Sequence, residues 1–206
     1  ALLADGQVQT AREVALAGLD ISRDSGLLLS LGSVLCALNE FDEALNVLGE
    51  AASSNTHAAV ANYRLGLVHL EKKNVERAIQ CLEIAVDRDP GHLQSRFQLG
   101  LGYYQTGRLA SAARQFERCL QNHAPFPELL NNLGAVYSAL ERWDKAITTY
   151  RNALDLAPES AAAHYNLALA YYELNQPSDA RRHLEEARRL GQPIPARLLL
   201  ELNQRR

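Results

Sequence analysis

The chain has 206 residues, of which 47% are hydrophobic and 22% are charged, so it has enough apolar side chains for a sizeable core. Its formal net charge of -3 argues against nucleic-acid binding, which requires a basic face, and gives no support for adhesion to an anionic membrane. The longest apolar run, residues 27–38, falls short of the roughly 18 residues of a spanning helix, so direct membrane insertion is not expected.

Small residues that directly follow a leucine recur along the chain. They return every 34 residues, at Gly32, Gly66, Gly100, Gly134 and Ala168. An alanine stands twelve residues after each of them, at Ala44, Ala78, Ala112, Ala146 and Ala180. Small side chains let two helices approach to about 8–10 Å, and this gain offsets the cost of about 1 kcal/mol for a glycine inside a helix. The repeat therefore predicts an all-α fold of antiparallel helical hairpins.

Each 34-residue unit is predicted to contain a first helix, a short turn and a second helix. The complete units are residues 25–58, 59–92, 93–126, 127–160 and 161–194. Turns are expected near Asn39-Glu40, Lys73-Asn74, Gly107-Arg108, Glu141-Arg142 and Asn175-Gln176. Proline lacks a backbone N–H and disfavours helix in the residue before it, so second helices should stop before Pro90, Pro125 and Pro158.

This pattern resembles the tetratricopeptide repeat (TPR) family, whose unit of 34 residues carries W-x2-L-G-x2-Y, then A-x3-F and a proline. Residues 131–137 read NNLGAVY and are followed by Ala146, Tyr150 and Pro158. Residues 97–103 read FQLGLGY, with Ala112 and Phe116 after them. The leading tryptophan is absent from all five units. The resemblance implies a right-handed α-solenoid, a superhelix that binds other proteins and is not an enzyme.

The resemblance extends to both ends of the chain. Residues 1–24 fit the second half of a truncated repeat, with Gly6 at the turn between helices and Ala11 and Gly18 at small positions of the second helix. The expectation is that further residues precede them in the full-length protein. Residues 195–206 are expected to form a C-terminal helix that covers the apolar flank of the last repeat, as repeat arrays require.

In this family the first helix of each unit lines a concave groove, through its second, fifth, sixth, ninth, twelfth and thirteenth residues. The resemblance therefore implies a partner-binding groove with apolar walls and amides, formed by Tyr63, Arg64, Leu67, Leu70, Phe97, Gln98, Leu101, Tyr104, Asn131, Asn132, Tyr165, Asn166, Leu169 and Tyr172. Such a groove suits an amphipathic helix or an extended peptide, because apolar anchors supply affinity and amides pair with backbone. The alternative for the aromatic residues is that they pack against neighbouring helices; these are Tyr63, Phe97, Tyr104, Tyr165 and Tyr172.

Two ligand classes known in the family can be compared with these positions. Co-chaperone members hold a C-terminal carboxylate with lysines at the fifth and second positions of successive units, but the lysines here are Lys72, Lys73 and Lys145, at neither position. We therefore expect no binding of the acidic C-terminal tails of the major heat-shock chaperones. Asn132 and Asn166 are similar to asparagines of O-linked N-acetylglucosamine transferase repeats, which hold a threaded peptide, but only two of the five units comply.

Catalytic, cofactor and metal sites are not expected. The three cysteines Cys36, Cys81 and Cys119 form no C-x-x-C pair and are expected to be free thiols, which favours a reducing, cytoplasm-like compartment. The six histidines show no H-E-x-x-H spacing, and there is no phosphate-binding loop or nucleophile elbow.

Three functions follow as hypotheses. The first is a scaffold or adaptor that holds a peptide or partner helix in its groove and helps to assemble a multiprotein complex. The second is the substrate-recognition segment of a larger enzyme, such as a glycosyltransferase similar to O-linked N-acetylglucosamine transferase. The third is self-association through stacking of the repeat ends.

Overall fold

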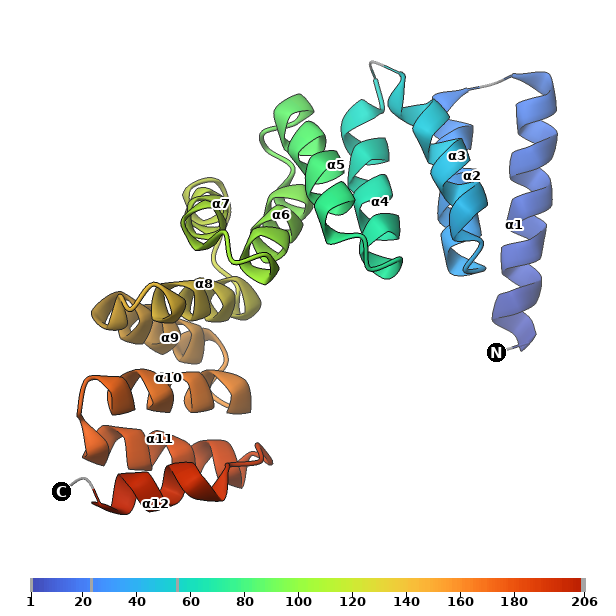
Figure 1. The fold of residues 1–206 in the computed structure, drawn as a ribbon. Coiled ribbons are helices and arrows are strands. Elements are labelled where there is room, and N and C mark those ends of the chain that lie inside the picture. The colour runs from blue at the N-terminus through green and yellow to red at the C-terminus, as the bar shows by residue number, and fades with distance from the viewer. Residues whose placement is uncertain (1, 23, 55, 205–206) are drawn as a thin grey trace. The chain divides into compact units, whose positions relative to one another are not determined.

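The computed structural model describes residues 2–22, 24–54 and 56–204. This described part is all-helical and contains no strand, which confirms the predicted fold class. Its helices are α1 (Leu2–Ile21), α2 (Ser25–Ala37), α3 (Phe41–Ala52), α4 (Ala58–Glu71), α5 (Val75–Arg88), α6 (Leu93–Gln105), α7 (Leu109–Asn122), α8 (Pro127–Ala139), α9 (Trp143–Leu156), α10 (Ala161–Glu173), α11 (Pro177–Arg189) and α12 (Ala196–Gln204) (Figure 1). None of these helices combines the length and the apolar character that crossing a bilayer requires.

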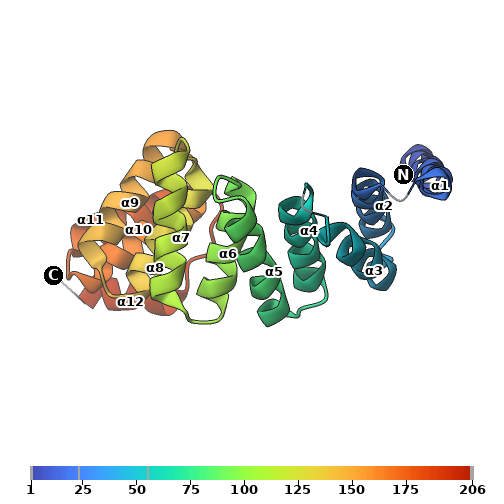
Figure 2. The ribbon, with the colours of Figure 1, turned by 90° about the horizontal axis from the view of Figure 1, so that it is seen from above.

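The chain forms two compact units, residues 1–102 and residues 103–206, whose boundary falls inside the last turn of α6. In the first unit α1 packs on α2, α2 on α3, α3 on α4 and α4 on α5. In the second unit the same neighbour-to-neighbour packing runs from α7 to α12 (Figures 1 and 2). Each of these helices is therefore stabilised by the helices next to it in sequence, as expected for stacked hairpins.

The predicted small residues lie where the two helices of a hairpin come closest. A Cβ atom on Gly32 would lie 2.4 Å from Leu48 Cδ2, and one on Gly134 would lie 2.5 Å from Tyr150 Cε1. The alanines that recur in the second helices are fully buried at 0% exposure: Ala44, Ala78, Ala112, Ala146 and Ala180. The 34-residue repeat therefore arises because each hairpin makes the same helix–helix contact once.

The turns inside the hairpins share one backbone conformation. The second residue after each first helix has a left-handed φ of 55–74°, and these residues recur every 34 positions, at Asn39, Lys73, Gly107, Glu141 and Asn175. The next residue donates its N–H back to the helix, for example from Arg142 to the Tyr137 carbonyl at 2.8 Å. This pattern closes the helix C-terminus, and it confirms the predicted turn positions. The second helices α5, α7 and α9 end before Pro90, Pro125 and Pro158, also as predicted.

The first helix differs from the prediction. The turn expected at Gly6 does not form, because α1 continues through this residue from Leu2 to Ile21. A glycine inside a helix costs only about 1 kcal/mol, so the helix can continue through this position. Instead α1 packs as one continuous helix. Its Ala15 is buried, and Arg12 Nη1 lies 3.1 Å from Glu40 Oε1.

A helix also forms in the C-terminal segment, where α12 covers Ala196–Gln204. Its Leu202 is 1% exposed, and the Leu202 carbonyl accepts a hydrogen bond of 2.7 Å from Arg181 Nη2 on α11. Residues 205–206 of the expected terminal helix, and residue 1 of the expected truncated repeat, lie outside the described residues.

A pair of glycine substitutions tests the close helix approach. We expect Gly134→Ala to lower the free energy of unfolding by about 1–3 kcal/mol, because the new methyl group meets the ring of Tyr150, which is 2% exposed and cannot move aside. Urea denaturation followed by circular dichroism gives the measurement.

The matched control is Gly49→Ala on the exposed side of α3, where a Cβ meets nothing within 4 Å. This change should raise stability by up to about 1 kcal/mol, since alanine is the better helix former. Equal effects at the two positions would show that the glycine at 134 is not required for helix packing.

Candidate functional site

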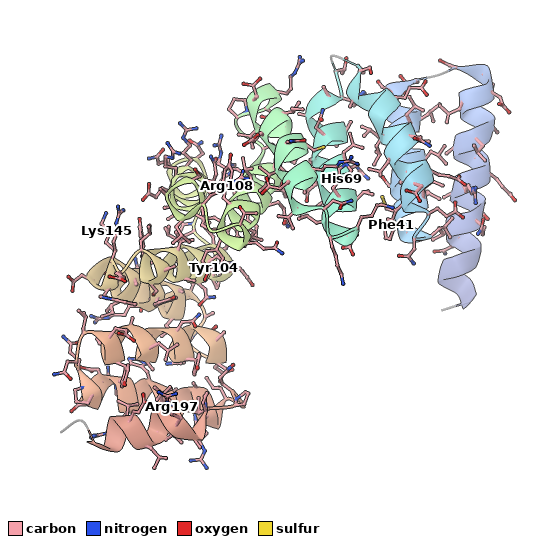
Figure 3. All side chains as sticks on the ribbon, in the orientation of Figure 1. Phe41, His69, Tyr104, Arg108, Lys145 and Arg197 are labelled. Atoms are coloured by element: carbon pink, nitrogen blue, oxygen red, sulfur yellow. The ribbon has the colours of Figure 1, made fainter. Side chains whose placement is uncertain are left out.

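The residues predicted to form a groove lie on the first helices of the repeats, α4, α6, α8 and α10. In the first unit these are Tyr63, Arg64, Leu67, Leu70, Phe97, Gln98 and Leu101. In the second unit they are Tyr104, Asn131, Asn132, Tyr165, Asn166, Leu169 and Tyr172. All of them are half-buried except Tyr104, which is 38% exposed at the end of α6 (labelled in Figure 3). Each unit therefore presents its own part of the predicted set at its surface.

In the first unit a cavity of about 460 Å³ opens between α2 and α4. It is lined by Ser33, Cys36, Ala37, Asn39, Phe41, Arg64, Leu67, Val68 and Glu71. Phe41, labelled in Figure 3, is the first residue of α3. The walls are mainly apolar, with one cationic and one anionic side chain among them. Only Arg64 and Leu67 of these residues belong to the predicted set. Ser33, Cys36, Ala37 and Glu71 also fall at groove positions of the family register, although the predicted set did not include them. Asn39 and Phe41 lie outside the first helices, and Val68 lies at a register position not assigned to the groove, so the register missed these three.

Arg64 is held in place inside this cavity. Its guanidinium donates a hydrogen bond to the Ser33 hydroxyl, which itself donates to the Leu29 carbonyl at 2.7 Å. Burial raises the pKa of the Cys36 thiol, although the nearby Arg64 charge partly opposes this effect. Cys36 is therefore a neutral thiol at physiological pH, and Arg64 supplies the positive charge of the cavity.

In the second unit the structure brings two predicted amides together. Asn166 Nδ2 on α10 donates to Asn131 Oδ1 on α8 at 3.1 Å. Asn132, which the sequence grouped with Asn166, instead donates to the Glu128 carbonyl of its own helix at 2.8 Å. The amide pair that links neighbouring repeats is thus Asn131 with Asn166.

A second cavity, of about 840 Å³, lies beside this amide pair. It is formed by the start of α8 and the connection between α9 and α10, and it is lined by Pro127, Glu128, Asn131, Ala157, Pro158, Glu159, Ser160 and Ala162. Of these residues the predicted groove set included only Asn131, and the sequence identified Pro158 only as a helix stop, so most of this surface was missed. Its lining combines prolines and alanines with the carboxylates of Glu128 and Glu159 and the polar side chains of Asn131 and Ser160.

Some predicted groove residues are engaged inside the protein. The Tyr172 hydroxyl donates to Glu201 of α12 at 2.9 Å, and the Tyr63 ring packs edge-on against His92 with centroids 5.0 Å apart. Burial raises the pKa of Tyr63, so its hydroxyl stays protonated. The tyrosines that follow the Leu-Gly or Leu-Ala pair in three of the repeats differ in burial, since Tyr137 and Tyr171 are each 7% exposed, whereas Tyr103 is half-buried.

A histidine pair on α10 and α11 was not found from the sequence. His164 Nδ1 lies 3.0 Å from His183 Nδ1, and His164 Nε2 lies 3.0 Å from the Pro158 carbonyl, which can only accept. Arg182 Nη2 lies 3.3 Å from His183 Nε2 and can only donate. His183 Nδ1 must therefore donate to His164 Nδ1, and His183 is neutral.

The surroundings of His183 explain its neutral state. Burial lowers its pKa to about 4, helped by Arg182, His164 and Arg151 and opposed by Asp179. The ring also stacks on Tyr171 with centroids 5.7 Å apart. Within the described residues no group of three or more histidine, cysteine, aspartate or glutamate side chains is placed to hold a metal ion.

Comparison with known proteins agrees with this architecture. Two family models described as tetratricopeptide repeat match the chain, one over residues 126–192 and one over residues 29–92 and 97–147. The chain therefore belongs to the tetratricopeptide repeat family.

Three curated relatives are similar to it over part of their length. The type IV pilus assembly protein PilF of Pseudomonas aeruginosa is 25% identical over 66% of this chain and 55% of PilF. The BBSome complex member BBS4 of Bos taurus is 26% identical over 77% of this chain and 37% of BBS4. The anaphase-promoting complex subunit cut9 of Schizosaccharomyces pombe is 26% identical over 72% of this chain and 23% of cut9. The chain thus spans about half the length of PilF, and less of the other two.

Solved structures share the fold. YrrB, described as a TPR protein with an unusual peptide-binding site, superposes with a TM-score of 0.83 at 19% identity over 94% of this chain and all of YrrB. MamA superposes with a TM-score of 0.73 at 19% identity, over 78% of this chain and 94% of MamA. At this level of identity the likeness shows the fold alone.

The histidine pair predicts how stability depends on pH. The pKa of His183 is lower in the folded protein than the ordinary value of about 6.5, so the unfolded chain binds more protons between pH 6.5 and about 4. Its contribution to the free energy of unfolding is therefore complete above about pH 6.5 and is lost as the pH falls toward 4.

Urea denaturation over this pH range, compared between the wild type and a His183→Gln variant, isolates this contribution from that of the carboxylates. The variant should lose less stability on acidification than the wild type. Parallel pH profiles for the two proteins would show that His183 does not titrate as described.

Proposed function

We propose that the chain is a non-catalytic scaffold or adaptor that binds a peptide or a partner helix through the first helices of its repeats and so helps to assemble a multiprotein complex. The observation that carries this proposal is that aromatic, leucine, arginine and amide side chains of the first helices remain half-exposed at the surface of the repeats. The small and apolar residues on the other side of the same helices are buried, as Leu65 (9% exposed) and Leu167 (0% exposed) are.

The chemistry of the half-exposed residues suits a protein ligand. Tyrosine, phenylalanine, leucine and arginine are present on α4 and α6, and aromatic residues and arginine are the types that contribute most to protein interfaces. On α8 and α10 the paired amides of Asn131 and Asn166 leave donors and acceptors that can bond to a peptide backbone. Side chains of these types suit contact with another protein.

The relatives support an assembly role. PilF is named for pilus assembly, BBS4 for membership of the BBSome complex and cut9 as a subunit of the anaphase-promoting complex. A structure of Cut9 with Hcn1 also shares the fold, with a TM-score of 0.67 at 20% identity over 98% of this chain and 40% of that one. YrrB adds a peptide-binding example with the same architecture.

Truncation of aromatic residues tests this surface. We expect a Tyr63→Ala and Phe97→Ala double variant to lose partners that the wild type captures from a lysate of the source cell, identified by quantitative mass spectrometry. Both rings are half-buried, so the loss of unfolding free energy should stay well below the about 3–5 kcal/mol of a fully buried phenylalanine.

The matched control is Phe116→Ala on α7, where the ring is 0% exposed. This variant should lose about 3–5 kcal/mol and show how unfolding by itself affects capture. If the double variant is destabilised as much as Phe116→Ala, the two rings belong to the core. If it is stable and captures every partner normally, the first helices are not the binding surface.

A further inference from the structure

We infer that the cavity of the first unit binds an amphipathic partner helix that carries an acidic and a basic residue seven positions apart, with an apolar residue between them. This inference rests on the proposed function and specifies one class of partner for it. It is built from four residues of α4, namely Arg64, Leu67, Val68 and Glu71, which we call the α4 stripe.

The α4 stripe lies on one side of its helix. Its members are spaced at i, i+3, i+4 and i+7, and such residues share a face. All four line the cavity between α2 and α4. Val68, which is 2% exposed, belongs to the core, whereas Leu67 is half-exposed. The stripe therefore places an apolar centre between a cation and an anion.

The two charges of the stripe have no ionic partner among the described residues, unlike Arg12 and Lys72 of the same unit. Arg12 pairs with Glu40 and Glu43, and Lys72 pairs with Asp42. Arg64, by contrast, is bonded to the neutral hydroxyl of Ser33. Glu71 is exposed at the C-terminal end of α4. A ligand with a carboxylate near Arg64 and a cation near Glu71 would complement both.

The spacing of Arg64 and Glu71 along the axis of α4 favours a helical ligand. Seven residues of α-helix span about 10.5 Å, because each residue rises 1.5 Å. A partner helix alongside α4 therefore places its own residues i and i+7 opposite Arg64 and Glu71, on one face. In an extended peptide the residues of one face recur at about 6.7 Å and about 13 Å, and neither distance matches.

The cavity between the charges accepts the apolar residue of such a helix. Its other walls come from Cys36 and Ala37 of α2 and from Phe41 of α3, and its volume is about 460 Å³. A leucine at i+3 or i+4 of the partner helix lies on the same face as the two charges and can enter this space. This is the arrangement by which an amphipathic helix lies in an apolar groove.

Binding of designed peptides tests the charge pattern. The probes are fluorescein-labelled, alanine-rich helical peptides of about 20 residues, long enough to be helical in water. They carry Glu-x2-Leu-x3-Lys, the reversed order Lys-x2-Leu-x3-Glu, or Gln in place of both charges. Fluorescence anisotropy should show that one charged order binds roughly fivefold more tightly, or better, than the Gln peptide.

Substitutions in the protein identify the groups responsible. Arg64→Gln should abolish the preference for the charged peptide, whereas Arg77→Gln, at an exposed arginine of α5 in the same unit, should leave it intact. An Arg64→Glu variant should regain binding when the peptide's glutamate is replaced by lysine. This exchange distinguishes a direct charge contact from misfolding of the variant.

Four results would overturn the inference. Equal binding of the charged and Gln peptides, or a peptide broken by a central proline binding as tightly, would exclude the helix and its charge pattern. Failure of every probe to bind would also overturn the inference. So would self-association of the wild-type protein in sedimentation experiments, if Arg64→Gln abolishes that association. In each of these cases the proposed function is tested separately, by the capture experiment with the Tyr63 and Phe97 variant.

Discussion

The close approach of two helices inside each hairpin is the contact on which the rest of the structure depends. A glycine of the first helix lies against a large side chain sixteen positions later, as Gly32 does against Leu48, Gly66 against Leu82 and Gly134 against Tyr150. Glycine disfavours a helix interior, but here the absence of a side chain allows the neighbouring residue to be completely buried. Leu48 and Leu82 are 0% exposed as a result.

This contact also determines which side chains remain available to a partner. When the glycine side of a first helix faces its own second helix, other positions of the first helix are left at the surface of the repeat. Arg64 and Leu67 on α4 are two of these, and the half-exposed Asn166 on α10 is another. Stability and the proposed binding therefore use different faces of the same helices, so the proposed binding face can change from one repeat to the next without disturbing the hairpin.

Side-chain hydrogen bonds between repeats orient polar groups on this scaffold. Asn166 bonds to Asn131 across two first helices, and Arg64 bonds to Ser33 in the same way in the first unit. These bonds orient an amide pair and a guanidinium before any ligand arrives, which reduces the ordering cost of binding. The His164–His183 contact has a different role, because it joins the two helices of one hairpin and keeps a neutral imidazole inside it.

The sequence alone determined the hairpins, their turns and the faces of the helices. It did so because the packing of a hairpin repeats every 34 residues and leaves small residues, leucines and turn residues at constant positions. The interpretation failed at Gly6, where α1 continues as one helix, because a single glycine costs a helix only about 1 kcal/mol. The tertiary structure alone decided which polar groups meet, such as Ser33 with Arg64, Asn131 with Asn166 and His164 with His183. These contacts depend on the rotation and stagger of neighbouring helices, which are set by packing against the whole unit, and the spacing of residues along one repeat does not encode them.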